Sequence, residues 1–372
     1  MTGQAADRRA ALLSRRRFLG AAAALSAGGW LAASGRPVRA AEGPGGLLAE
    51  GPGGLLVLPR GRDVALVTPD GADDRPIVSL QPGEFIADVA LSPDRSKVAF
   101  GYFTARTGDG PGGSDIVIAP VMAGTERTIV VPRDRPGMLL AAPQWSPDGS
   151  ALVFEAVGLT ATGQAGVTIE WVAADGTGRR TIAQTARYPS FSPDGQAVIS
   201  TRALPTGDAL WEHPAVGGEP RELIPEGQFL VVAYPRYSPD GARIAFAGVG
   251  DTLPIMPVPP MLETPGTQPG SSSAPPAPVT PKLLTSGSLS DSSVMRGVLA
   301  HGFPAEPWLM PAAGGEPRLL ARMPIDDAAI AWSPDGGWLA VSGASGLFMV
   351  NASDGAARRV AEVGSFGAID WR

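Results

Sequence analysis

Hydrophobic and polar residues alternate in short runs along most of this chain, and residues typical of turns separate the runs. Lys97-Val98-Ala99-Phe100, Arg243-Ile244-Ala245-Phe246 and Trp338-Leu339-Ala340-Val341 all show the two-residue period of a β-strand. Further runs, such as Asp115-Ile116-Val117-Ile118 and Thr168-Ile169-Glu170-Trp171-Val172, lie just before Gly-containing turns. The pattern therefore predicts many short strands joined by hairpins.

One turn motif, Ser-Pro-Asp, recurs ahead of these runs. Proline presets φ near −65°, aspartate can bond the backbone two residues on, and the glycine that usually follows accepts a positive φ. We therefore predict hairpin turns in which the aspartates are structural and the preceding aromatic residue is a core anchor. The five copies are Ser92-Pro93-Asp94, Ser146-Pro147-Asp148, Ser192-Pro193-Asp194, Ser238-Pro239-Asp240 and Ser333-Pro334-Asp335.

The spacing of the copies sets the number of repeats. Successive motif serines are 54, 46, 46 and 95 residues apart, so the last gap has room for a unit that lacks the motif. Its expected parts are Ser288–Ser293, then strands at Val298–Ala300 and Pro307–Met310. Four strands per unit is the composition of one blade of a β-propeller.

The two ends of the mature chain are expected to share one blade. Ala368-Ile369-Asp370-Trp371 matches Ala329-Ile330-Ala331-Trp332, but no turn follows it. Leu55-Leu56-Val57-Leu58 is the expected partner strand, followed by Val64-Ala65-Leu66-Val67. We therefore predict an all-β propeller with seven blades, the first closed by N- and C-terminal strands. Six blades are the alternative, with residues 250–306 as one long insertion.

These repeats resemble the WD-repeat-like blades of TolB-type β-propellers. The resemblance covers nearly all of the chain after its leader, and it implies a fold, in TolB's case with six blades. TolB proper is a periplasmic partner of an envelope-tethering lipoprotein and carries an α/β domain before its propeller. Only about fifteen residues separate the expected cleavage point from the first strand here, which argues against that domain and that role.

The first forty residues have the features of an export signal. Arg15, Arg16, Phe18 and Leu19 fit the twin-arginine motif, and a short apolar run and the cleavage pattern Val38-Arg39-Ala40 follow. We therefore predict a signal peptide over residues 1–40 and a single extracytoplasmic domain over residues 41–372, without a membrane span. A Pro/Ser-rich stretch, residues 253–281, is expected to be an inserted surface loop.

Composition narrows the possible chemistry. The chain has no cysteine, which excludes disulfides, cysteine metal sites, thiol catalysis and a lipoprotein anchor. Its net charge is −6, and removal of the arginine-rich leader would bring it to about −12. Nucleic acid is thus an unsuitable partner, since binding it requires many lysines and arginines.

No catalytic constellation is recognisable in the sequence. The two histidines, His213 and His301, form no zinc-protease pattern, and Gly343-Ala344-Ser345-Gly346 lacks the spacing of a nucleophile elbow. We therefore expect no catalytic, cofactor or metal site. The predicted function is that of an exported, monomeric, non-enzymatic propeller that binds a protein or a cell-envelope component. The alternative is a small-ligand-binding or hydrolytic propeller with its site at the channel mouth.

Overall fold

The computed structural model describes residues 53–372 except 105–111, 122–125, 160–164, 251–303 and 324. Within these ranges the chain forms strands and no helix. Four sheets have four strands each. Their strands, in sheet order, are β24 (Asp370–Trp371), β1 (Leu56–Arg60), β2 (Asp63–Val67), β3 (Asp74–Ser79); β4 (Glu84–Leu91), β5 (Lys97–Thr104), β6 (Gly113–Pro120), β7 (Thr128–Val131); β11 (Arg180–Gln184), β10 (Ala165–Ala173), β9 (Ala151–Leu159), β8 (Leu139–Trp145); and β20 (Ala329–Trp332), β21 (Trp338–Gly343), β22 (Gly346–Asn351), β23 (Ala357–Ala361).

A fifth sheet has eight strands because one long strand takes part in two groups. β15 is 17 residues long; its first half pairs with β14 and its second half with β16. Seven of its strands thus form two four-stranded groups that share β15. Its strands are β12 (Arg187–Phe191), β13 (Ala197–Leu204), β14 (Gly207–Pro214), β15 (Arg221–Tyr237), β16 (Arg243–Gly250), β17 (Pro304–Pro311) and β18 (Arg318–Leu319), with β19 (Ile325–Asp326) paired to β17.

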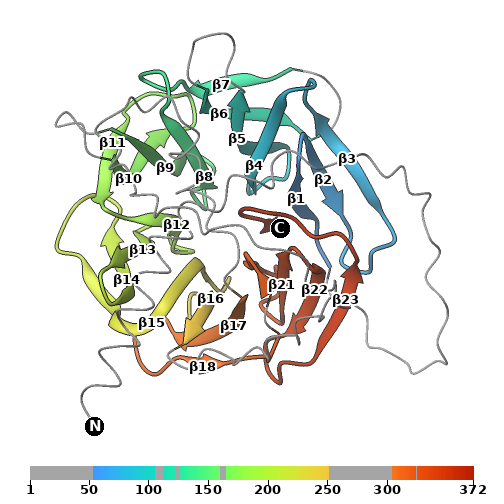
Figure 1. Ribbon diagram of the computed structural model, residues 1–372, viewed down its shortest axis with the longest axis vertical. Coiled ribbons are helices and arrows are strands. Elements are labelled where there is room, and N and C mark those ends of the chain that lie inside the picture. The colour runs from blue at the N-terminus through green and yellow to red at the C-terminus, as the bar shows by residue number, and fades with distance from the viewer. Residues whose placement is uncertain (1–52, 105–111, 122–125, 160–164, 251–303, 324) are drawn as a thin grey trace, which may run out of the picture.

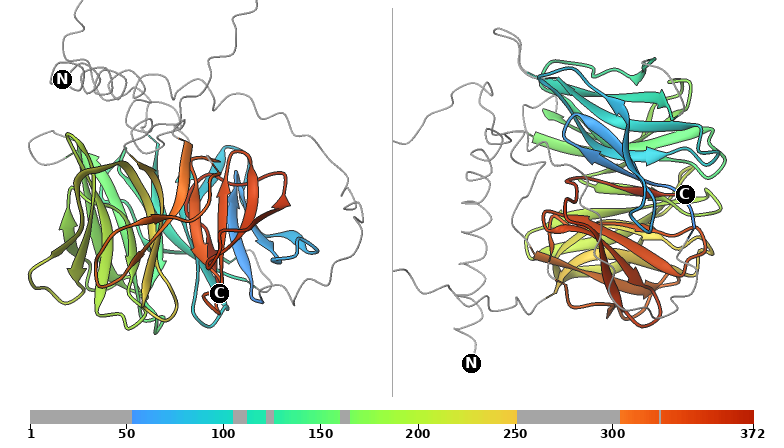
Figure 2. Two further views of the ribbon diagram at one scale, coloured as in Figure 1. Left: turned by 90° about the horizontal axis from the view of Figure 1, so that it is seen from below. Right: turned by 90° about the vertical axis from the view of Figure 1, so that its right-hand side faces the viewer.

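The sheets are arranged around a common centre, with the earliest and latest strands side by side (Figure 1). β24 pairs antiparallel with β1, and Trp371 lies opposite Leu56. Seen from the side, the sheets stand next to one another in a thick ring (Figure 2). The all-β, propeller-like arrangement of four-stranded sheets predicted from the repeats is therefore confirmed.

One strand was correctly predicted from the sequence but was assigned to the wrong repeat unit. Pro307–Met310 lies in β17, where Trp308 pairs with Phe246 and Leu309 with Ala245 of β16. The strand therefore belongs to the same unit as the Ser238 copy of the motif, because a hydrogen-bonded ladder joins them. The other expected parts of the additional unit, at 288–293 and 298–300, lie outside the described residues, as do the leader 1–40 and the insertion 253–281. Seven blades are not confirmed.

The hydrophobic core lies between neighbouring sheets. Phe100, Phe154 and Phe246 are fully buried and occupy the same place in three repeats, eight residues after the motif serine. A cluster containing Ala90, Leu140 and Phe154 joins strands of two adjacent sheets. The core therefore fixes the orientation of each sheet relative to the next, and with it the geometry of the centre.

Candidate functional site

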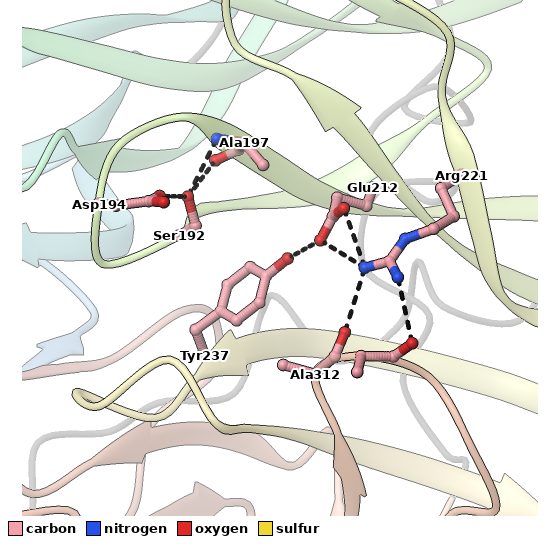
Figure 3. Close-up of polar contacts among 8 residues, drawn as sticks. Ser192, Asp194, Ala197, Glu212, Arg221, Tyr237 and Ala312 are labelled. Carbon is pink, nitrogen blue, oxygen red and sulfur yellow. Dashed lines mark hydrogen bonds and ion pairs between the residues drawn. The ribbon is translucent and has the colours of Figure 1, made fainter.

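Each motif copy forms the turn between the first two strands of its group. The first strand ends at the residue before the motif serine, and the second begins five residues after that serine. The serine Oγ donates to the aspartate Oδ1 at 2.5–2.6 Å in all five copies. It also accepts the N–H of the fifth following residue. Figure 3 shows this for Ser192, Asp194 and Ala197.

The turns also pack against one another. A Cβ at Gly149 would lie 3.6 Å from Cδ of Pro93, and one at Gly195 would lie 3.5 Å from Cδ of Pro147. Gly241 and Gly336 face the prolines of the preceding copies in the same way. Contact between successive turns therefore builds a continuous rim of small and rigid residues.

This rim surrounds a cavity of about 350 Å³, which we call the mouth. All five motif prolines line it. Five aromatic residues beside the motif turns or their C-terminal equivalent also line it, namely Trp145, Phe191, Tyr237, Trp332 and Trp371. A pocket of this size lies within the range of roughly 300–1,000 Å³ that is usual for ligand sites.

Two of the mouth's tryptophans hold neighbouring sheets together. Trp145 Nε1 donates to the carbonyl of Ala90 at 3.2 Å, and Trp332 Nε1 donates to the carbonyl of Arg236 at 3.0 Å. Both side chains are almost fully buried. These aromatic residues are core anchors whose edges contribute apolar surface to the mouth.

Polar side chains form part of the mouth's lining, with an excess of positive charge. Arg95, Arg236 and Arg372 line the mouth together with a single aspartate, Asp370. Asp370 Oδ2 accepts the N–H of Leu91 at 2.9 Å and lies 3.4 Å from Nε of Arg372. The carboxylate of Asp370 thus already interacts with neighbouring residues of this chain.

Two buried donors of the lining have no partner within the described part of the chain. They are Nε of Arg236 and Nε2 of Gln144, on side chains that are 7 % and 4 % exposed. Arg236 Nη1 donates to the carbonyl of Pro235 at 3.1 Å. Burial lowers the pKa of Arg236 from its ordinary value, because desolvation penalises the charged form.

A repeated bulge lies behind the mouth, at the centre of the ring. Asp88, Ala142, Tyr188 and Tyr234 each stand four residues before a motif serine and have φ between 48° and 61°. The strand register shifts at each of these positions. A positive φ is uncommon for residues other than glycine, and bulges often redirect side chains near functional sites. These bulges were not predicted from the sequence.

Asp88 joins three sheets at this level. Its Oδ1 accepts the N–H of Ala368 at 2.6 Å and its Oδ2 accepts the N–H of Ala142 at 3.1 Å. Gly367, with φ of 101°, permits this approach, because a Cβ there would lie 2.8 Å from the Asp88 nitrogen. Burial raises the pKa of Asp88 above its ordinary value, although both hydrogen bonds oppose the shift.

A second, much smaller cavity adjoins Asp88. Its volume is about 30 Å³, enough for one or two water molecules. Glu155, Arg187, Tyr188 and Tyr234 also line it. Glu155 Oε1 accepts the N–H of Tyr188 at 2.5 Å, and burial raises the pKa of Glu155. This cavity is too small for a substrate, so the mouth is the stronger candidate site.

His213, the histidine that lies among the described residues, does not form an accessible catalytic pair. His213 Nε2 lies 3.0 Å from Ser200 Oγ, but Ser200 is fully buried and His213 is 7 % exposed. Ser200 occupies the repeat position that is phenylalanine in three other units, so the pair fills a core site. Burial lowers the pKa of His213. Among the described residues no group of three His, Asp or Glu side chains could hold a metal ion; His301 lies outside them.

The two halves of the eight-stranded sheet are connected by a polar network (Figure 3). The hydroxyl of Tyr237 donates to Oε2 of Glu212. Arg221 Nη2 donates to Glu212 Oε1 at 3.0 Å and to the carbonyl of Ala312 at 3.2 Å. This network holds the Tyr237 side of the mouth in place.

The turn aspartates should make stability depend on pH. The Ser92 hydroxyl and then the Ser96 N–H lower the pKa of Asp94 from 3.8 to about 2. Hydrogen bonds from the motif serine and from a backbone N–H lower the pKa of the other four motif aspartates as well. A lowered folded-state pKa stabilises the fold above the unfolded-state pKa, and this contribution is lost as the pH falls from about 4 to about 2. In Asp94→Asn, the melting temperature should fall below that of the wild type at pH 6, and the difference should shrink toward pH 2. An unchanged difference would contradict this role.

Arg95 should be replaceable by glycine with a gain in stability. Its φ is 62°, at the position where the other four turns have glycine. A residue with a Cβ is disfavoured there, so we expect Arg95→Gly to stabilise the fold by about 0.5–1 kcal/mol. Urea denaturation would measure the gain, with Arg95→Ala as the control that keeps the Cβ. A loss of stability in Arg95→Gly would show that the Arg95 side chain itself stabilises the turn.

The sequence matches no protein-family model and no curated protein. The structure is similar to TolB from Acinetobacter baumannii (16 % identity, TM-score 0.57), covering 86 % of this chain and 66 % of TolB. It is equally similar to a chain of a nidogen/laminin complex (11 % identity, TM-score 0.57), covering 86 % of this chain and 98 % of that one. A puromycin hydrolase matches at 14 % identity and TM-score 0.50, covering 85 % of this chain and 46 % of the hydrolase.

These similarities show the fold alone. The chain spans just under two thirds of TolB and less than half of the hydrolase. The three proteins also bear names of quite different kinds, and fold does not imply function. In the described residues, no helix is long and apolar enough to cross a membrane.

Proposed function

We propose that this chain is an exported, non-enzymatic propeller that binds a segment of an extracytoplasmic protein in its mouth. The observation that carries the proposal is the mouth itself, a cavity of about 350 Å³ on the ring axis, lined by all five motif prolines. The ring is proposed to have six blades, with the eight-stranded sheet counted as two and the pairing of β24 with β1 closing the first.

The lining of the mouth suits a peptide segment. Proline rings and tryptophan edges offer rigid apolar surface that loses little entropy on binding, and arginine and glutamine donors can meet backbone or side-chain acceptors. The rim is also preorganised, because each motif turn is fixed by its own serine and aspartate. A rigid concave site of this kind suits a bound peptide segment, because little order has to be created on binding.

Site-specific crosslinking tests the proposal. Since the chain has no cysteine, Pro239→Cys places a unique thiol on an exposed residue of the Ser238 turn that lines the mouth. A photoreactive group on this thiol, in the protein's native extracytoplasmic setting, should crosslink one protein in stoichiometric yield. The matched control is Ser79→Cys, an exposed residue at the end of the edge strand β3. Equal capture from both positions would contradict binding in the mouth.

Export by the twin-arginine route is a separate part of the proposal. Arg15→Lys combined with Arg16→Lys should leave the uncleaved precursor inside the cell, because the signal depends on the arginine pair. Cell fractionation followed by immunoblotting measures this. Normal export of the double variant would remove the twin-arginine assignment and leave the binding site unaffected.

A further inference from the structure

We infer that the mouth recognises a carboxylate side chain on an acidic peptide segment, with Arg95, Gln144 and Arg236 as the residues that select it. This inference rests on the proposed function in one respect, that the mouth is the binding site. It adds the chemical class of the ligand.

Arg95 has a backbone conformation that is unfavourable for an arginine. Four of the five motif turns have glycine at this position, and the fifth holds an arginine at φ of 62°. An arginine is disfavoured there, whereas glycine adopts this conformation freely. Arg95 is exposed and its side chain lines the mouth. Its positive charge therefore lies in the lining of the mouth, where it can attract an incoming anion.

The lining of the mouth also contains a pair of unsatisfied hydrogen-bond donors. Arg236 Nε and Gln144 Nε2 are buried without a hydrogen-bond partner in the described structure. Buried donors without partners are rare in folded proteins, because each carries the full penalty of desolvation. Both side chains belong to the lining of the mouth, so a group bound there is the candidate partner of these donors. Such a group must be a hydrogen-bond acceptor.

Arg236 has no nearby counter-ion in the described part of the chain. Within the described ranges, no carboxylate forms an ion pair with this guanidinium. Asp370 and Asp88 interact with it only over longer distances. The oxygens of Asp370 are taken up by Leu91, Trp371 and Arg372, and those of Asp88 accept the N–H groups of Ala142 and Ala368. The motif aspartates are bonded within their own turns. A buried cation of this kind is best satisfied by a carboxylate, which forms strong charge-assisted hydrogen bonds with guanidinium groups.

An amide-for-acid comparison tests the ligand class. The probes are a fluorescein-labelled nine-residue peptide of alternating Gly and Glu and the same peptide with Gln in place of Glu, added to the full-length mature protein. In fluorescence anisotropy the Glu peptide should bind at least about tenfold more tightly than the Gln peptide, and its affinity should fall as salt is added. Arg95→Gly should weaken binding of the Glu peptide about three- to tenfold while raising the melting temperature.

Two controls separate charge at the mouth from charge in general. Arg95→Lys keeps the charge and should retain most of the affinity. Arg322→Gln removes a charge from a side chain that is 78 % exposed and outside the mouth's lining, and should leave binding unchanged. Because Arg95→Gly is expected to stabilise the fold, a loss of affinity there cannot come from unfolding.

The remaining outcomes overturn the inference. Equal binding of both peptides would show that the mouth accepts a segment without selecting a carboxylate, and the proposed function would stand. Binding of neither peptide, with Pro239→Cys still capturing a partner, would lead to the same conclusion. If free glutamate displaces the labelled Glu peptide at a concentration similar to that of the peptide, the ligand is a small carboxylic acid and not a protein segment.

Discussion

Replacing Trp332 by alanine should lower the free energy of unfolding by about 3–5 kcal/mol. The indole is 5 % exposed, and its Nε1 donates to the carbonyl of Arg236 in the neighbouring sheet at 3.0 Å. The Arg243 guanidinium lies 4.8 Å from the ring centroid. Truncation thus leaves a cavity between two sheets and an unpaired carbonyl. Urea denaturation monitored by far-UV circular dichroism measures the loss.

Two variants give this prediction its controls. Trp332→Phe keeps a ring in the site but removes the N–H donor, so we expect a smaller loss of about 1–2 kcal/mol. Ile129→Ala removes a side chain that is 53 % exposed on β7 and should change stability by less than about 0.5 kcal/mol. A loss in Trp332→Ala no larger than that in Ile129→Ala would show that the turn aromatics do not connect the sheets.

Replacing Asp88 by alanine should have a comparable effect, about 2–5 kcal/mol, through a different cause. The change leaves the buried N–H groups of Ala142 and Ala368 without an acceptor, and each unpaired group costs about 1–3 kcal/mol. Alanine also tolerates φ of 61° less well than aspartate does. Thermal and chemical denaturation measure the loss. A change under about 1 kcal/mol would show that Asp88 does not connect the sheets around it.

The pH dependence of this variant separates the hydrogen bonds from the charge. Because burial raises the folded-state pKa of Asp88, the group stabilises the fold most below its unfolded-state pKa, and its contribution declines as pH rises through the folded-state pKa. The stability difference between wild type and Asp88→Ala should therefore be larger at pH 4 than at pH 7. Asp88→Asn keeps one acceptor and tolerates the positive φ, so its loss should be smaller at both pH values. A difference that grows with pH would contradict the raised pKa.

The sequence predicted the parts of the fold that depend on local chemistry. The Ser-Pro-Asp turns could be found because proline, aspartate and glycine meet the needs of a turn within a few residues of one another. The strands that follow them could be found because burial on alternate positions leaves a two-residue period. Resemblance between repeats then indicated the propeller.

The structural features that were not predicted from the sequence depend on pairing between distant segments. Pro307–Met310 has the pattern of a strand, but only its ladder with β16 shows which unit it joins. The bulge residues have no common side chain, since Asp88, Ala142 and Tyr188 occupy equivalent places. Their one signal is a proline four residues before the motif proline in three repeats, at Pro143, Pro189 and Pro235. Arg95 could have been noticed as the one exception to glycine in the motif.

The mouth itself could not be read from the sequence. Gln144 and Arg236 are 92 residues apart and belong to different sheets, and only the closure of the ring brings their side chains to one cavity. Their unsatisfied donors are likewise visible only when every potential partner has been placed. Arrangement of many repeats around an axis is a global property, whereas the turn motif is a local one.

Blocking the mouth tests most directly whether the partner binds there. A bulky maleimide adduct on Pro239→Cys, whose side chain lines the mouth, should abolish binding of the partner captured by crosslinking, whereas the same adduct on Ser79→Cys should leave that binding intact. Surface plasmon resonance with the purified partner measures both proteins, and unchanged melting temperatures show that the fold is kept. Full binding by the protein carrying the adduct at residue 239 would contradict the proposal that the partner enters the mouth.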